Sequence, residues 1–288
     1  MNMLSTPALN ASQRRWTARA IADTAVRALC DEALLTPKPA LVDRRGCGAH
    51  GDMDLPMLLR SALTLRAMFE KVARCAITMS TKTNLRERLT EIGLRGEREM
   101  LAATGGVNTH RGAIWTLGLL CAARAMNDDT ATIGELCAGA ARIARLPTNA
   151  SVALSHGRSV FLRFGARGAR GEAEDGFPHV CNVALPALRA SRALGHDEIH
   201  AQLNALLHLI ASIDDTCLLY RGGAEALHVA QTGAQVVLSA GITTAAGKAA
   251  LAELDRKLLA LNASPGGSAD LLAATLLLDR FAPATEAA

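Results

Sequence analysis

Apolar residues recur every three or four positions along most of this sequence, and short polar segments rich in glycine interrupt them. This spacing places apolar side chains on one face of an α-helix. Alternating runs of β-branched residues, which favour strands, are absent. The pattern therefore predicts an all-α fold. The predicted helices span residues 12–35, 54–69, 84–103, 111–126, 132–145, 149–164, 182–194, 197–213, 224–240, 247–261 and 268–281.

Proline and capping residues mark several helix boundaries. Pro37 and Pro39 exclude a helix in their segment. Asp54 is typical of a helix start, and Thr132 with Glu135 has the sequence of a capping box. Because connections between packed helices gather at the ends of a bundle, we expect a multi-helix bundle with its glycine-rich loops at one end. These loops are residues 36–54, 104–112, 165–178, 214–223 and 263–270.

The composition limits the class of protein. Of 288 residues, 50% are hydrophobic and 3% are aromatic, which excludes a disordered protein. We interpret residues 1–288 as one domain, with a flexible segment at 1–11. The net charge of +4 is too small for a nucleic-acid-binding domain but suits anionic small molecules. No apolar run approaches the roughly 18 residues of a membrane span. Seven cysteines without a Cys-x-x-Cys pair indicate a reducing cytoplasm.

Three motif-like segments lack the residues that their sites require. Residues 241–248 resemble a phosphate loop, but the spacing between the glycines is one residue too long and Ala249 replaces the metal-binding hydroxyl. The glycines of 165–171 have no preceding strand, as a dinucleotide fold would need. His196 and His200 lack a third metal ligand, so we interpret them as part of an exposed helix face.

Five connections combine glycine with charged and polar side chains. They are GAHGDMD at 48–54, TGGVNTHRG at 104–112, GARGARGEAEDGFP at 165–178, IDDT with RGG at 213–223, and SPGGSAD at 264–270. Each one alone is more simply a helix cap or a turn. A loop that directly precedes a helix can hold an anion, and arginines beside carboxylates suit phosphate together with a metal. The recurrence of this pattern favours a nucleotide pocket.

In this order, the clusters resemble the triphosphoribosyl-dephospho-CoA synthase family, which makes the prosthetic-group precursor of citrate lyase and malonate decarboxylase. The longest matching motifs are ATGGVNTHRG at 103–112 and SPGGSADLLA at 264–273, and the resemblance spans about residues 36–280. Other matching motifs are TPKP at 36–39, GAH at 48–50 with Asp52, GE at 96–97 leading to Met100, RGEA at 170–173, GFP at 176–178, DT at 215–216 and RGG at 221–223. Trp115, DDTCLL at 214–219 and LLAATLLLDR at 271–280 look most like the malonate decarboxylase branch. Two positions differ, because Ala40 stands where the family usually has glycine and Arg111 where many members have lysine.

The resemblance implies a transferase that takes ATP and 3′-dephospho-CoA as substrates. The triphosphoribosyl group moves to the 2′-hydroxyl of dephospho-CoA and adenine leaves, commonly with Mg²⁺ as cofactor. The product would pass to a separate acyl carrier protein transferase, and neither nucleic acid nor a membrane is an expected partner. The adenine–ribose bond breaks through an oxocarbenium-like state, so the chemistry needs a carboxylate near the attacking hydroxyl and a proton donor near adenine.

These requirements give the candidate residues hypothetical roles under the resemblance. Either Glu172 or Asp215 is the base, and His50 or His110 protonates or orients the departing adenine. For each histidine, a hydrogen bond within its own loop is the structural alternative. The candidates for phosphate and substrate binding are Lys38, Gly105, Gly106, Asn108, Arg111, Arg170, Arg221, Gly266, Gly267 and Ser268. The candidate Mg²⁺ ligands are Asp52, Asp214 and Asp270.

Two other classes of protein compete with this interpretation. An all-α, Mg²⁺-dependent prenyl-diphosphate enzyme would need a carboxylate at the position of Leu218, where the chain has none. A non-catalytic helical adaptor would use the five clusters only as turns. Binding of ATP distinguishes the adaptor from both enzymes.

Overall fold

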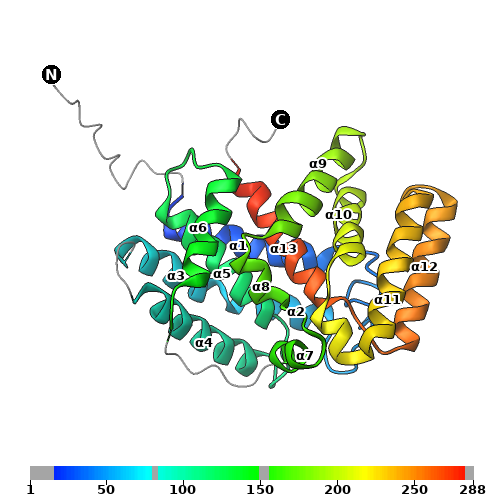
Figure 1. The fold of residues 1–288 in the computed structure, drawn as a ribbon, viewed down its shortest axis with the longest axis horizontal. Helices are drawn as coiled ribbons and strands as arrows, with labels where there is room; N and C mark the ends of the chain where they lie inside the picture. The colour runs from blue at the N-terminus through cyan, green and yellow to red at the C-terminus, as the bar shows by residue number, and fades with distance from the viewer. Residues whose placement is uncertain (1–15, 80–83, 149–155, 283–288) are drawn as a thin grey trace.

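The computed structural model describes residues 16–79, 84–148 and 156–282, and helices account for most of these ranges (Figure 1). The helices are α1 (Ala18–Leu34), α2 (Leu55–Thr64), α3 (Arg66–Met79), α4 (Leu85–Ala103), α5 (Arg111–Met126), α6 (Ile133–Arg145), α7 (His156–Phe164), α8 (Gly168–Glu174), the π-helix η1 (Val180–Ala184), α9 (Leu185–Ala193), α10 (Glu198–Ser212), α11 (Thr216–Ala240), α12 (Ala245–Ala260) and α13 (Gly266–Phe281). Over the described ranges there is no β-strand, and the only β-type pairing is an isolated bridge between Asp43 and Gly46. The all-α prediction is confirmed.

Local capping fixes helix starts where the sequence predicts them. The carboxylate of Asp54 accepts a hydrogen bond from the Met57 N–H at 2.8 Å. The Thr132 hydroxyl accepts from the Glu135 N–H at 3.2 Å, and the Glu135 carboxylate accepts from the Thr132 N–H at 2.8 Å, which completes the capping box. α4, α5, α6, α10 and α12 begin and end within two residues of their predicted bounds. The parts of the predictions that cover 1–15 and 149–155 lie outside the described residues.

Several predicted boundaries are wrong, most of them where glycine lies inside or beside a helix. The loop predicted at 165–178 contains α8, and the side chain of its N-cap residue Arg167 lies against Gly171, where a Cβ atom would not fit. The helix predicted from residue 224 begins at Thr216, because Asp215 caps it and Gly223 takes a non-helical φ of 65° within it. α13 begins at Gly266, and the predicted cap Ser268 lies inside its first turn. The helix predicted at 54–69 divides into α2 and α3.

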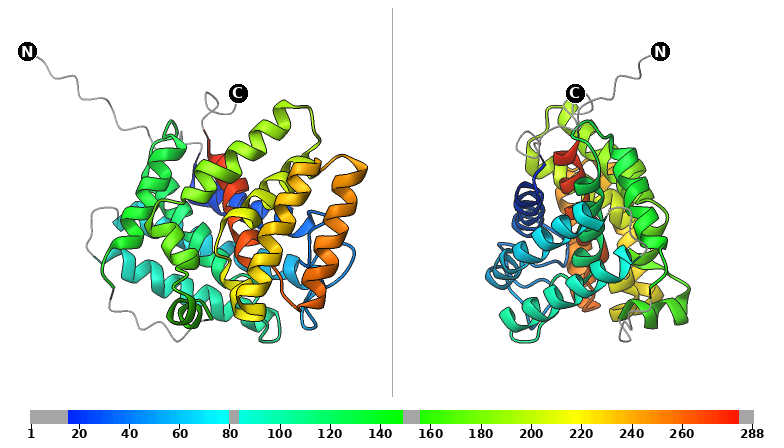
Figure 2. Two further views of the ribbon diagram at one scale, coloured as in Figure 1. Left: turned by 45° about the vertical axis from the view of Figure 1, so that its right-hand side comes forward. Right: turned by 90° about the vertical axis from the view of Figure 1, so that its left-hand side faces the viewer.

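The helices surround a core in which α5 and α13 are buried along most of their lengths. One continuous apolar cluster joins residues from α1 to α13, and Trp16 packs edge-on against Phe281 with ring centroids 4.8 Å apart. α11 and α12 form a helical hairpin that projects at one side of the bundle (Figures 1 and 2). In the part of the chain that the structure describes, no helix combines the length and apolarity needed to span a bilayer.

Candidate active site

Asp215 links the first turns of two helices that are distant in sequence. Its carboxylate accepts hydrogen bonds from the N–H groups of Cys217 (2.9 Å) and Leu218 (3.4 Å) in α11. It also accepts bonds in α13 from the N–H groups of Gly267 (3.2 Å) and Ser268 (2.8 Å), and from the Ser268 hydroxyl (2.9 Å). Burial raises the pKa of Asp215, and these hydrogen bonds oppose the rise. Since both carboxylate oxygens accept from the protein, Asp215 holds the two N-termini together.

The first turn of α13 also reaches the first turn of α5. A Cβ atom at Gly112 would lie 1.9 Å from Oδ2 of Asp270, so the missing side chain allows this carboxylate to approach α5 closely. Burial raises the pKa of Asp270 well above its ordinary value, the nearby Glu32 and Asp215 raise it further, and a hydrogen bond from the Ala113 backbone opposes them. Asp270 nevertheless stays partly accessible to solvent. The N-termini of α5, α11 and α13 therefore meet around two carboxylates.

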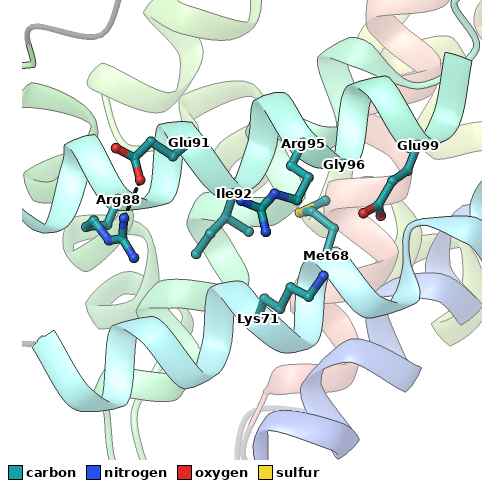
Figure 3. Close-up of a pocket in the computed structure, with 8 residues that line it drawn as sticks. All are labelled: Met68, Lys71, Arg88, Glu91, Ile92, Arg95, Gly96 and Glu99. Atoms are coloured by element: carbon teal, nitrogen blue, oxygen red, sulfur yellow. Dashed lines mark hydrogen bonds and ion pairs between the residues drawn. The ribbon is translucent and has the colours of Figure 1, made fainter.

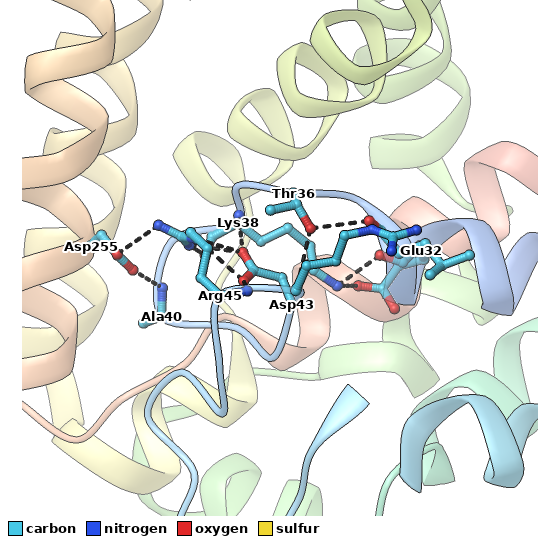
Figure 4. A network of polar contacts seen from close by, with 9 residues as sticks. Glu32, Thr36, Lys38, Ala40, Asp43, Arg45 and Asp255 are labelled. Carbon is cyan, nitrogen blue, oxygen red and sulfur yellow. Dashed lines mark hydrogen bonds and ion pairs between the residues drawn. The ribbon is translucent and has the colours of Figure 1, made fainter. Parts of the chain in front are cut away.

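Lys38 forms a buried ion pair with Glu32 (Figure 4). The charge of Glu32 acts on Asp270 of the acidic centre. Nζ of Lys38 donates to Oε1 of Glu32 at 2.6 Å and to the Glu32 carbonyl at 2.7 Å, and Lys38 is only 1% exposed. The Lys38 N–H donates to Asp43 at 2.9 Å, and Asp255 of α12 accepts from the Ala40 N–H at 2.6 Å. Ala40 has a φ of 54°, a conformation that favours glycine. The ammonium of Lys38 thus neutralises an internal carboxylate, where we predicted a phosphate contact.

His110 lies directly before α5 and is 4% exposed. Its Nδ1 is 2.8 Å from the Ser61 hydroxyl, which in turn is 2.6 Å from the Thr109 hydroxyl. Its Nε2 is buried and has no hydrogen-bond partner. Burial, and to a smaller extent the charge of Lys38, lower the pKa of His110 to about 4. The imidazole is therefore neutral at physiological pH and fixes the loop that begins α5.

His50 and Arg221 join three of the glycine-rich clusters. Nε2 of His50 is 2.9 Å from the Ser264 hydroxyl, and Arg221 donates to Nδ1 of His50 at 2.9 Å. Arg221 also donates to the Ala49 carbonyl at 2.7 Å. Burial and the charge of Arg221 lower the pKa of His50 to about 4. These contacts bring 48–54, 221–223 and 264–270 together, as the sequence predicts for loops at one end of the bundle.

A second arginine approaches the same region from α5. Nε of Arg111 donates to Glu97 at 2.6 Å, and the Arg111 N–H donates to the Asn108 side chain at 3.2 Å. Burial lowers the pKa of His156, and the charges of both Arg111 and Arg221 lower it further. The two guanidinium groups are therefore close enough to act on one imidazole, and they give the site a cationic edge.

Glu172 contacts His179, which is not among the predicted site residues. Its Oε1 accepts from the His179 N–H at 2.8 Å, and its Oε2 is 2.8 Å from Nδ1 of His179. The hydrogen bond that the His179 ring donates to Glu172 is the main cause that raises the pKa of His179, and the charges of Glu172 and Asp214 add to it. Because Asp214 directly precedes Asp215, this pair faces the loop that begins α11. The quoted motif GFP ends at residue 178, one position before this histidine.

Several other predicted binding residues make hydrogen bonds within the protein, away from the Asp215 and Asp270 carboxylates or along their own loops. Arg170 is an exposed residue whose Nε donates to Glu174 at 2.7 Å, one turn further along α8. The N–H of Gly106 donates to the Leu101 carbonyl at 2.8 Å, and that of Gly266 to the Ser264 carbonyl at 2.9 Å. Gly105, like Gly106, has a positive φ in the turn after α4. The amides of Gly106 and Gly266 thus have partners within the protein.

The three predicted metal ligands do not form one set. Over the ranges that the structure describes, no three His, Cys, Asp or Glu side chains are grouped so that they could hold a metal ion. Asp52 and Asp214 are exposed, whereas Asp270 lies at the centre of the site. Mg²⁺ in nucleotide sites commonly takes one or two carboxylates together with substrate phosphates. Asp270 fits that limited role.

A separate pocket lies between α3 and α4 (Figure 3). Its lining side chains carry charges of both signs, and none of them is a predicted site residue. They are Met68, Lys71, Arg88, Glu91, Ile92, Arg95, Gly96 and Glu99. The predicted residues instead meet around the N-termini of α5, α11 and α13, and this region is the candidate active site.

Fold and site together define an all-α protein with a buried acidic centre and a cationic edge, an arrangement suited to a phosphorylated substrate. The sequence matches the family described as ATP:dephospho-CoA triphosphoribosyl transferase over residues 18–287, and the chain belongs to that family. It is accordingly a transferase.

Two named relatives of known sequence agree with this assignment. A Klebsiella pneumoniae protein named 2-(5''-triphosphoribosyl)-3'-dephosphocoenzyme-A synthase is 50% identical over 264 residues, which cover 91% of this chain and 94% of that protein. A Pseudomonas fluorescens Pf-5 protein named "Probable 2-(5''-triphosphoribosyl)-3'-dephosphocoenzyme-A synthase" is 54% identical over 267 residues, with 92% of each chain covered. A crystal structure from Archaeoglobus fulgidus covers 74% of this chain and 96% of its own, with a TM-score of 0.48 and 18% identity.

Proposed function

We propose that the protein transfers the triphosphoribosyl group of ATP to the 2′-hydroxyl of 3′-dephospho-CoA and releases adenine. Family membership supports the reaction. The structural observation that carries the proposal is the meeting of five sequence-distant clusters at the N-termini of α5, α11 and α13. A reaction that joins two nucleotides needs such a convergence, because one site must hold a polyphosphate and two sugars in register.

Arg111 and Arg221 are the groups best placed to bind the triphosphate. Asp215 already accepts the amide N–H groups at the starts of α11 and α13, so these amides are occupied. Guanidinium groups bind phosphate oxygens through paired, charge-assisted hydrogen bonds. Binding would replace their present contacts with Glu97 and with the Ala49 carbonyl. The cationic edge is therefore an exchangeable phosphate clamp.

Asp270 is the carboxylate that would share a Mg²⁺ ion with the phosphates. Its raised pKa reflects a charge that burial, Glu32 and Asp215 all disfavour, and a cation beside it would relieve that cost. When bound, Mg²⁺ supplies neutralisation of the triphosphate charge. Asp52 and Asp214 stay exposed at the edge of the region and are not needed for this role.

Glu172 is the better of the two predicted base candidates. Asp215 accepts five hydrogen bonds from two helix starts, and its loss would separate those helices. Glu172 instead contacts a half-buried imidazole that faces the start of α11. We propose that the proton of the 2′-hydroxyl is removed at Glu172 and the imidazole that it contacts, and not at Asp215. We further propose that the product passes to an acyl carrier protein transferase of the malonate decarboxylase pathway, in the cytoplasm.

The test is product analysis by mass spectrometry after mixing ATP, Mg²⁺ and 3′-dephospho-CoA. We expect equimolar adenine and triphosphoribosyl-dephospho-CoA, with CoA as a control acceptor that differs only by its 3′-phosphate. Arg111→Gln and Arg221→Gln should each lower kcat/KM for ATP by about 10- to 100-fold, the equivalent of one charge-assisted hydrogen bond. Arg256→Gln, at an exposed ion pair of α12, is the matched control. Folded wild-type protein that releases no adenine contradicts the proposal.

A further inference from the structure

We infer that His179 is the group that accepts the proton of the attacking 2′-hydroxyl, and that Glu172 acts by positioning His179. This inference rests on the proposed function and assigns a catalytic residue within the same site. It follows from the hydrogen bonds between Glu172 and His179, from the turn that holds the two residues, and from the charged groups around them.

The hydrogen bonds of the pair leave the imidazole as its accessible member. Both oxygens of Glu172 face His179, one at the backbone N–H and one at Nδ1, each at 2.8 Å. The side chain of Glu172 is 8% exposed, and that of His179 is 34% exposed. Nδ1 is the ring nitrogen that Glu172 engages, so a proton acceptor facing a substrate would be Nε2. In the Ser-His-Asp triad of other enzymes, a buried carboxylate fixes the tautomer and orientation of the catalytic imidazole in the same way.

A tight turn between α8 and η1 places His179 over Glu172. Gly176 and Phe177 both take positive φ values, 84° and 59°, and reverse the chain direction. The Phe177 N–H donates to the Glu172 carbonyl at 2.8 Å, and the Phe177 side chain is fully buried. A non-glycine residue in the left-handed region is strained and persists only where surrounding contacts impose it. The imidazole is thus held on a rigid turn.

The carboxylates around His179 favour the protonated form of its imidazole. Glu172 faces it from α8 and Asp214 from the loop before α11, and both raise its pKa. Cys137 of α6 and Cys181 of η1 lie beside Glu172, with their sulfur atoms 3.0 Å apart. Their hydrogen bond and burial raise the pKa of Cys137, so this neighbour stays a neutral thiol. The two carboxylates would stabilise the imidazolium that forms when the hydroxyl proton arrives.

The scheme balances in bonds and protons. The oxygen of the 2′-hydroxyl forms a bond to the anomeric carbon of ATP ribose, and its proton moves to Nε2 of His179. The bond from that carbon to the adenine nitrogen breaks, its electron pair stays with adenine, and a proton from water or an acid group completes neutral adenine. His179 then returns its proton to solvent. No oxidant or further co-reactant is required.

The dependence of kcat/KM on pH tests the inference. In the wild type, kcat/KM should rise with pH through the raised pKa of His179, because the neutral imidazole is the active form. His179→Ala should lose about 100- to 10,000-fold and lose this rise, and added imidazole should restore part of the rate. In Glu172→Gln, the pKa of His179 falls, so the rise should move to lower pH while measurable activity remains. Should Glu172 itself be the base, this variant would instead be inactive at every pH.

Controls separate this inference from folding and from the proposed function. His228→Asn replaces an exposed histidine of α11 and should keep the wild-type profile. Proton NMR of the His179 ring should show its pKa falling in Glu172→Gln, and circular dichroism should show both variants folded. Folded His179→Ala with a wild-type rate and profile overturns the inference while leaving the proposed function intact. A wild-type protein without adenine release rejects the proposed function itself.

Discussion

The buried pair of Lys38 and Glu32 gives a quantitative test of why the loop at 36–54 carries a lysine. The Nζ–Oε1 distance is 2.6 Å, and both residues are more than nine-tenths buried. Lys38→Met leaves the Glu32 carboxylate without its cation, and such a change costs about 3–5 kcal/mol. The uncompensated Glu32 also repels Asp270, whose pKa it already raises. Against a total stability of about 5–15 kcal/mol, the loss should be large in urea unfolding followed by circular dichroism.

The double variant Glu32→Gln with Lys38→Met completes the test. Replacing both charges removes the desolvation cost of each, so its unfolding free energy should lie within about 1 kcal/mol of wild type. If Lys38 serves only to neutralise Glu32, the double variant should also keep most of its adenine release. A phosphate-binding Lys38 would leave the double variant folded but inactive. The reasoning is refuted if Lys38→Met alone costs less than about 1 kcal/mol with an unchanged m-value.

Four further predictions concern residues near the same centre. Gly112→Ala forces a methyl group against Oδ2 of Asp270 and should destabilise the protein by about 1–3 kcal/mol in urea unfolding, with loss of adenine release. Burial lowers the pKa of His110 to about 4, so on acidification the unfolded state takes up this proton before the folded state does. The free energy of unfolding should therefore fall by about 3 kcal/mol as the pH drops from 6.5 to 4, and His110→Asn should reduce that fall. Ala40→Gly relieves a φ of 54° and should raise the unfolding free energy by up to about 1 kcal/mol. The pKa of Asp270 is raised in the folded protein, so its ionisation costs stability once the pH exceeds the pKa that this carboxyl has in the unfolded chain. Asp270→Asn should therefore be inactive yet more stable than wild type at pH 7. An equal or lower free energy of unfolding would contradict this.

The helices were predictable where their signals are local. The capping box at Thr132 and the cap at Asp54 form within single turns, and both occur as the sequence indicates. α8 was missed because glycines at 168 and 171 resemble a loop, although the helix is stabilised by packing against distant segments. Gly168, for example, lies against the Thr216 side chain. Contacts of this kind have no local signature, so propensity alone assigns the segment wrongly.

The site residues were predictable as chemical types, but their partners were not. Asp215 and Ser268 were both selected from their motifs, yet the hydrogen bonds between them join positions 53 residues apart. The periodicity of the helices does not specify which two N-termini will meet. His179 was missed because its connection to Glu172 passes through Phe177, whose positive φ is unusual for a residue with a bulky side chain. The signal available was the Pro178–His179 step that directly follows the GFP motif.

The balance of charge at the centre explains why these carboxylates differ in role. Lys38 neutralises Glu32, and the first turns of α11 and α13 surround Asp215 with N–H donors. Asp270 has the Ala113 amide to oppose a pKa that burial and two neighbouring carboxylates raise. Its charge is therefore the least compensated of the three, and it is partly accessible. A substrate that brings a cation with its triphosphate would supply the missing compensation, while the arginines at the edge would bind the remaining phosphate charge. Under the proposed function, the charges of the centre would be balanced only with the nucleotide bound, so nucleotide binding would stabilise the folded protein.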